Sequence, residues 1–149
     1  MNACSPGRIG LLLLLMLLLA GCEKDRLDEQ VKVLCAKDGG VKVYETVKLP
    51  KESFTEHGDL KFYRATKGED ALGPDYIFVS EITEIKSGNP SLKRWYYRIV
   101  RRTDGHILGE SISYARGGGD MPGPWHGSSF HCPNKEVGEI FLMREVFRP

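Results

Sequence analysis

The sequence lacks the local motifs by which most small enzymes are recognised. It contains no Gly-x-Ser-x-Gly elbow for a nucleophilic serine. The glycine run at 117–119 is followed by Asp120, and not by the Gly-Lys-Ser/Thr that a phosphate-binding loop requires. None of the four cysteines belongs to a Cys-x-x-Cys pair of the kind that binds zinc. These absences favour a non-catalytic protein without a cofactor or a metal site.

Long apolar runs are also scarce, and residues 9–20 form the one that stands out. This run is shorter than the roughly 20 residues that a helix needs to cross a bilayer, so it is typical of a signal peptide. Arg8 is the only charged residue before Glu23, so a short positive segment precedes the run.

The sequence Leu19-Ala20-Gly21-Cys22, at the end of this run, resembles the lipobox of bacterial lipoprotein signal peptides. The resemblance implies that residues 1–21 are cleaved off and that Cys22 carries a diacylglyceryl thioether and an acylated N-terminus. Several acyl chains anchor more firmly than one, because each buried CH₂ contributes about 0.8 kcal/mol. In Gram-negative lipoproteins, an Asp directly after the lipidated cysteine often acts as a retention signal. This chain has Glu23 at that position, so the resemblance favours the outer membrane, facing the periplasm. The alternative is an ordinary secretory signal followed by a chance cysteine.

Neither sign of charge dominates. The chain has 21 basic and 20 acidic residues, and residues 1–21 contain one basic residue, Arg8, and no acidic one. Residues 22–149 are therefore neutral overall and long enough for one domain. This balance argues against nucleic acid as a partner.

After cleavage and lipidation, only Cys35 and Cys132 remain as thiols. In an oxidising compartment they have one intramolecular pairing available, so we expect a disulfide between them. The alternatives are two separate thiols or a bond to another chain.

The fold class follows from hydrophobic periodicity. Leu27, Val31, Leu34 and Cys35 form one helical stripe, which predicts a helix over 25–37. This helix starts so soon after Cys22 that no long tether separates the domain from the membrane. Strand patterns occupy 41–49, 60–65, 76–86, 92–102 and 106–115, and 137–147 fits strand slightly better than helix. We therefore expect an α+β domain, with the N-terminal helix packed on a mostly antiparallel meander of about five strands.

Asp104-Gly105 suits a two-residue hairpin turn, which would set the register of the strands on either side. Thr103 would then lie opposite His106. Arg94, Arg98 and Arg102 would emerge on the outer face with Ser111 and Ser113. The predicted core face would hold Trp95, Tyr97, Ile99, Ile112 and Tyr114.

Two segments are candidates for binding. The loop over 116–135 is long for a compact domain and contains Trp125, His126 and His131. Trp125 stands among prolines, either as a rigid contact for a partner or as a lid folded over the sheet. The basic and aromatic strand 93–102 would bind an anion, or its arginines would pair with Glu81 and Glu84, which we favour.

These observations lead to a hypothesis of a lipid-anchored envelope protein that binds another periplasmic or outer-membrane component. A second hypothesis is an inhibitor of a cell-wall hydrolase that inserts the 116–131 loop into the enzyme. A third, from a different class, is a metal-dependent or hydrolytic enzyme that uses His126 and His131.

Overall fold

A computed structural model describes residues 23–120, 123 and 126–149 of the protein. Its first element is a helix, described over residues 23–38. The elements that follow are β1 (Gly40–Val43), β2 (Val47–Lys48), η1 (Lys51–Ser53), η2 (Ala65–Asp70), β3 (Tyr76–Lys86), β4 (Ser91–Arg101), β5 (Ile107–Gly117), β6 (Ser129–Cys132), α2 (Glu139–Val146) and β7 (Phe147–Arg148).

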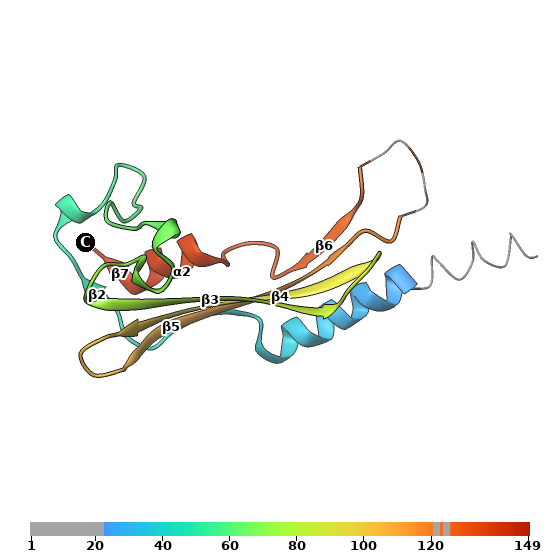
Figure 1. Cartoon of the computed structure of the whole chain (residues 1–149), viewed down its shortest axis with the longest axis horizontal. Coiled ribbons are helices and arrows are strands. Elements are labelled where there is room, and N and C mark those ends of the chain that lie inside the picture. The colour runs from blue at the N-terminus through green and yellow to red at the C-terminus, as the bar shows by residue number, and fades with distance from the viewer. Residues whose placement is uncertain (1–22, 121–122, 124–125) are drawn as a thin grey trace, which may run out of the picture.

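The main sheet has five antiparallel strands in the order β1-β5-β4-β3, and β6 also pairs with β5. β1 pairs with the first half of β5 and β6 with its last residues, so both lie along the same edge. The predicted α+β fold is confirmed. Strands β3, β4 and β5 are long and run side by side through the whole molecule (Figure 1).

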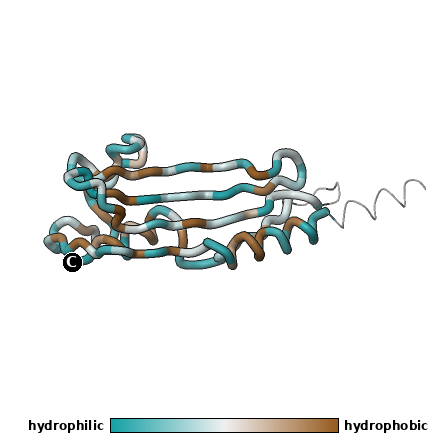
Figure 2. Tube along the Cα trace, turned by 90° about the horizontal axis from the view of Figure 1, so that it is seen from below, coloured by the Kyte–Doolittle hydropathy of each residue, from teal (hydrophilic) through white to brown (hydrophobic). Residues whose placement is uncertain are grey.

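Two separate cores lie on opposite faces of this sheet, at opposite ends (Figure 1). The N-terminal helix covers one face near the β3–β4 turn, where Leu27 and Val31 pack with Leu92, Ile112 and Tyr114. Hydrophilic and hydrophobic residues alternate along its turns (Figure 2), as the predicted stripe requires. α2 covers the other face at the far end. The second core contains Leu60, Leu72, Phe78, Ile99, Leu108, Leu142, Val146 and Phe147.

The predicted register of the β4–β5 hairpin is wrong by two residues at the turn and by one residue beyond Leu108. Arg101 and His106 face each other across a four-residue turn, in which an Asp104 oxygen accepts the His106 N–H at 3.0 Å. Leu108 then has no opposite residue, because the register shifts there. Ile112 and Tyr114 therefore lie on the face of the N-terminal helix. Trp95 and Tyr97 lie opposite Ser113 and Ser111, on the face of α2.

The predicted strand over 137–147 is wrong, because residues 139–146 form the helix α2. Leu142, Met143 and Val146 make a buried stripe at helical spacing. The helix lies so close to β5 that a Cβ on Gly109 would come within 2.8 Å of Val146 Cγ2. The glycine therefore permits the close approach of α2 to the sheet.

Two shorter predictions also need correction. The strand expected over 41–49 is broken, because the N–H groups of Tyr44 and Glu45 both donate to Leu108 O and the chain leaves the main sheet there. Its continuation, β2, pairs in parallel with β7. The segment 60–65 makes only a single bridge, between Leu60 and Phe54.

Candidate functional site

The residues that follow the predicted lipid site are fixed to the sheet. Cys22 itself lies outside the described residues. Lys24 Nζ lies 2.6 Å from Asp120 Oδ1, in the segment after β5. Lys86 Nζ, at the end of β3, lies 3.3 Å from Glu23 Oε1. The first described residues of the helix are thus held at the end of the sheet that carries the β3–β4 turn.

Asp120 joins this helix to the far side of the long loop. One carboxylate oxygen accepts the Ser128 hydroxyl at 2.7 Å, and the other accepts the Ser128 backbone N–H. Lys24 and these Ser128 donors hold the pKa of the Asp120 carboxyl well below its usual range. The carboxylate therefore stays charged and binds both groups at neutral pH.

Arg116 is the most deeply buried charged side chain of this region, with 2% of its surface exposed. Its guanidinium donates to both carboxylate oxygens of Asp28 in the helix, at 2.7 and 3.2 Å. It also donates to Gly118 O at 2.6 Å and to Ser128 O at 3.0 Å. One buried cation thus joins the helix, the strand β5 and both sides of the loop.

The predicted disulfide between Cys35 and Cys132 is present, with a Cα–Cα distance of 5.9 Å. Cys35 lies in the last turn of the N-terminal helix and Cys132 at the end of β6. Both pack in the same core as Tyr114 and Phe130. The bond therefore fastens the helix to the edge strand that leads towards α2.

Of the three predicted binding residues, His126 and His131 are described and exposed, whereas Trp125 lies outside the described residues. His131 stands on β6, with Nε2 at 2.9 Å from Ser129 Oγ. Within the described ranges, no three His, Cys, Asp or Glu side chains are grouped so that they could hold a metal ion.

His131 lines a pocket on the α2 face of the sheet, which we call the sheet-face pocket. Its volume is about 320 Å³. Trp95 and Tyr97 project from alternate positions of β4, and the segment that joins β6 to α2 borders the pocket through Asn134 and Val137. Both aromatic side chains are half-buried in the structure, whereas the predicted register placed them in the core.

The predicted pairing of the β4 arginines with Glu81 and Glu84 is not formed. Glu84 lies 3.9 Å from Lys93 instead. The guanidinium groups of Arg94 and Arg98 lie over the ring of Tyr96, with their Cζ atoms 4.9 and 5.6 Å from the ring centroid. The Tyr96 hydroxyl donates to Glu110 at 2.8 Å, and burial with this bond raises its pKa to about 12. Tyr96 is thus a neutral part of a packed polar surface.

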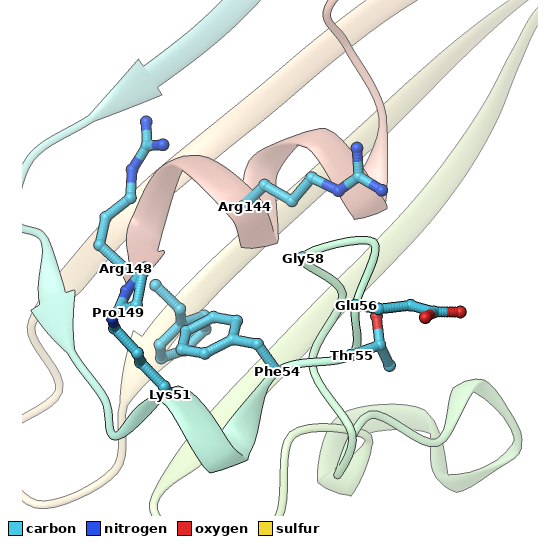
Figure 3. A pocket seen from close by; sticks show the side chains of 9 residues that line it. Lys51, Phe54, Thr55, Glu56, Gly58, Arg144, Arg148 and Pro149 are labelled. Atoms are coloured by element: carbon cyan, nitrogen blue, oxygen red, sulfur yellow. The ribbon is translucent and has the colours of Figure 1, made fainter.

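A second pocket, which we call the end pocket, lies at the opposite end from Lys24 and Asp120. Its volume is about 380 Å³. Figure 3 shows Phe54 in its wall, between the segment that carries Lys51 and Glu56 and the helix α2. Phe147, which is almost completely buried, also lines the pocket, as do Arg144 and Arg148. The pocket thus combines the aromatic ring of Phe54 with a mainly cationic border.

The cations at the rim of the end pocket differ in whether a carboxylate already pairs with them. Arg144 donates twice to Asp59 Oδ1, at 2.8 and 3.0 Å, and Arg148 donates to Glu145 at 2.5 Å. Among the described residues, no carboxylate lies within 4 Å of Lys51 Nζ. Lys51 is therefore the rim cation best placed to meet an anion from outside.

Comparison with protein-family models, with curated proteins and with solved structures finds no match. Within the described part of the chain, no helix combines the length and the apolar character needed to cross a bilayer.

Neither the burial of Arg116 nor either pocket could be predicted from the sequence. An arginine at the end of a predicted strand is ordinarily solvated, and its partner Asp28 is 88 residues away. The pocket residues Phe54 and Phe147 come from segments whose structure the periodicity did not reveal. His131, which was predicted as a binding residue, does line the sheet-face pocket, but the loop predicted over 116–135 is wrong at this point, because His131 lies on the strand β6.

Proposed function

We propose that this protein is a non-catalytic, lipid-anchored envelope protein that holds another periplasmic or outer-membrane protein at the membrane surface. The observation that carries the proposal is the pairing of Glu23 with Lys86 and of Lys24 with Asp120. If the lipid is on Cys22, these two ion pairs leave no flexible tether between lipid and fold.

An anchor at Cys22 would orient the molecule. The β3–β4 turn and the segment around Asp120 would lie next to the bilayer. Strands β3, β4 and β5, of 11 residues each, lead away from that end. At roughly 3.3 Å per residue they span about 35 Å. The end pocket would therefore be presented to the periplasm, away from the membrane.

The end pocket favours a protein partner that inserts an apolar side chain next to an acidic group. The half-buried ring of Phe54 supplies apolar aromatic surface, which is enriched where proteins bind one another. Lys51 supplies a cation for the acidic group, and a charge at a rim mainly speeds and orients association. This partner would be held at a fixed height above the lipid surface.

The test is photo-crosslinking in native envelopes with the full-length, lipidated protein. A benzophenone amino acid replaces Glu56, an exposed residue of the end pocket, and in a matched control it replaces Ser87, exposed in the β3–β4 turn. We expect a discrete crosslinked protein from position 56 and none from position 87. Crosslinking only from position 87, or none from either position, contradicts the proposal.

A further inference from the structure

The sheet-face pocket is built differently from the end pocket. Among the described residues that line it, none is a lysine, an arginine, an aspartate or a glutamate. Its floor is aromatic, and its border carries a hydroxyl, an imidazole and an amide, from Ser113, His131 and Asn134. A ligand that matches it is uncharged, has a flat apolar face and carries several hydrogen-bonding groups at its edge.

The floor is open because α2 begins only at Glu139, directly after the pocket residue Gly138, and does not cover this part of the sheet. α2 covers the cross-strand row of Phe78, Ile99 and Gly109. The row of Ile82, Trp95 and Ser113 lies four residues further along each strand, and Ile82 is 63% exposed there. The aromatic surface of Trp95 therefore continues onto exposed apolar surface at the edge strand β3.

The walls of the pocket are firmly held. Gly138 N–H donates to Ser111 Oγ at 3.0 Å, which fastens the border segment to β5 just before α2 begins. At its other end the same segment is fixed by the disulfide at Cys132. Tyr97 stacks on Phe78 at 6.0 Å, so the floor is continuous with the core beneath α2. A preformed site of this kind loses little conformational entropy when it binds.

Sugar rings have the chemistry that this site matches. The C–H groups on one side of a hexopyranose form a flat apolar face, which packs on the electron-rich face of an indole or phenol ring. Hydroxyl and acetamido groups project from the edge of the ring and accept and donate hydrogen bonds. The pocket volume of about 320 Å³ lies at the lower end of the range for ligand sites, roughly 300–1,000 Å³, and suits one unit of a longer chain.

We propose that the sheet-face pocket binds a short stretch of an uncharged glycan, with one sugar ring stacked on Trp95 and its polar groups held by His131 and Asn134. This site is separate from the end pocket. A glycan could therefore be bound while the end pocket holds a protein.

The experiment uses the full-length, lipidated protein in detergent micelles, with tetra-N-acetylchitotetraose as the probe and cellotetraose as a glycan without acetamido groups. The chain has two tryptophans, so Trp125→Phe leaves Trp95 as the only tryptophan reporter. We expect a saturable change in Trp95 fluorescence with at least one of the two glycans.

Two variants test the assignment of the polar groups. His131 and Asn134 are both exposed, so replacing them by alanine leaves the cores intact. Each replacement should weaken binding by roughly 2- to 10-fold, as the loss of one hydrogen bond implies. His106→Ala, an exposed histidine of the β4–β5 turn that lines neither pocket, is the matched control and should not change binding.

Absence of a saturable change with both glycans overturns the proposal. An equal affinity in His131→Ala, Asn134→Ala and the parent protein also overturns it, because the sugar would then lie elsewhere. Either result leaves the crosslinking test at Glu56 unaffected, so the two proposals fail separately.

Discussion

Arg116 on β5 donates two hydrogen bonds to Asp28 in the N-terminal helix, across 88 residues of sequence. The guanidinium is almost completely buried, and its remaining donors bind the backbone of the loop at Gly118 and Ser128. The orientation of the helix on the sheet and the path of the loop therefore depend on the same cation.

Replacing Arg116 by methionine should lower the free energy of unfolding by roughly 3 kcal/mol, because Asp28 and several loop carbonyls lose their donor. The measurement is chemical denaturation followed by circular dichroism. Arg102→Met is the matched control, since Arg102 makes an exposed ion pair with Asp70 and should cost at most about 1 kcal/mol. Equal losses in the two variants would show that burial of Arg116 adds nothing.

Stability should fall in acid through Asp120. The pKa of this carboxyl is lowered in the folded state, chiefly by Lys24 and then by Ser128, whereas in the unfolded chain it is about 3.9. The folded state binds the proton less tightly, so this contribution is complete above about pH 4 and is lost as the pH falls towards the folded pKa.

Asp120→Asn should therefore reduce stability at neutral pH and flatten its loss between about pH 4 and pH 2. Unfolding titrations at several pH values measure this slope. Asp75→Asn serves as the control, because Asp75 is exposed and makes no ion pair with any described residue. An unchanged slope in Asp120→Asn refutes the prediction.

Reduction of the bond between Cys35 and Cys132 should lower the free energy of unfolding by about 2–5 kcal/mol, because the bond closes a loop of 97 residues. Thermal melts with and without reductant measure the effect. Intact mass after thiol alkylation checks the pairing and should show both thiols masked before reduction. Alkylation of either thiol in the unreduced protein would contradict the bond.

Gly109→Ala should destabilise the protein by about 1–3 kcal/mol, since the added Cβ would overlap Val146 Cγ2 and crowd Leu142. Gly127→Ala is a suitable control, because the one described atom that its Cβ would meet is Asp120 Oδ2, at 3.8 Å. If both variants melt at the temperature of the parent protein, the contact of α2 with β5 is looser than described.

The N-terminal helix and the three long strands could be predicted because each rests on a local pattern. Leu27 and Val31 recur at helical spacing and are buried, and β3 begins and ends at the predicted residues 76 and 86. The pairing of Cys35 with Cys132 needed only the count of remaining thiols.

The faces of β4 and β5 could not be predicted, because the register depends on a turn and a bulge at Leu108 that the alternation does not encode. Each strand carries apolar residues on both faces, since different helices cover the two faces at the two ends. The sequence therefore placed Trp95 in the core, where the structure leaves it half-buried in a pocket. Likewise, the spacing of Leu142 and Val146 fits either a strand or a helix. The helix is formed because Gly109, which has no Cβ, lets α2 approach the sheet closely.

We propose that the fold is attached directly to the membrane by the end that carries Lys24 and Asp120. The most direct test is energy transfer from a fluorophore on a single added cysteine to an acceptor on the lipid headgroups, with the lipidated protein in vesicles. Ser87→Cys marks the β3–β4 turn and Glu56→Cys the end pocket. We expect strong transfer from position 87 and weak transfer from position 56, about 35 Å further away along the strands. Equal transfer from the two positions, or stronger transfer from position 56, would contradict it.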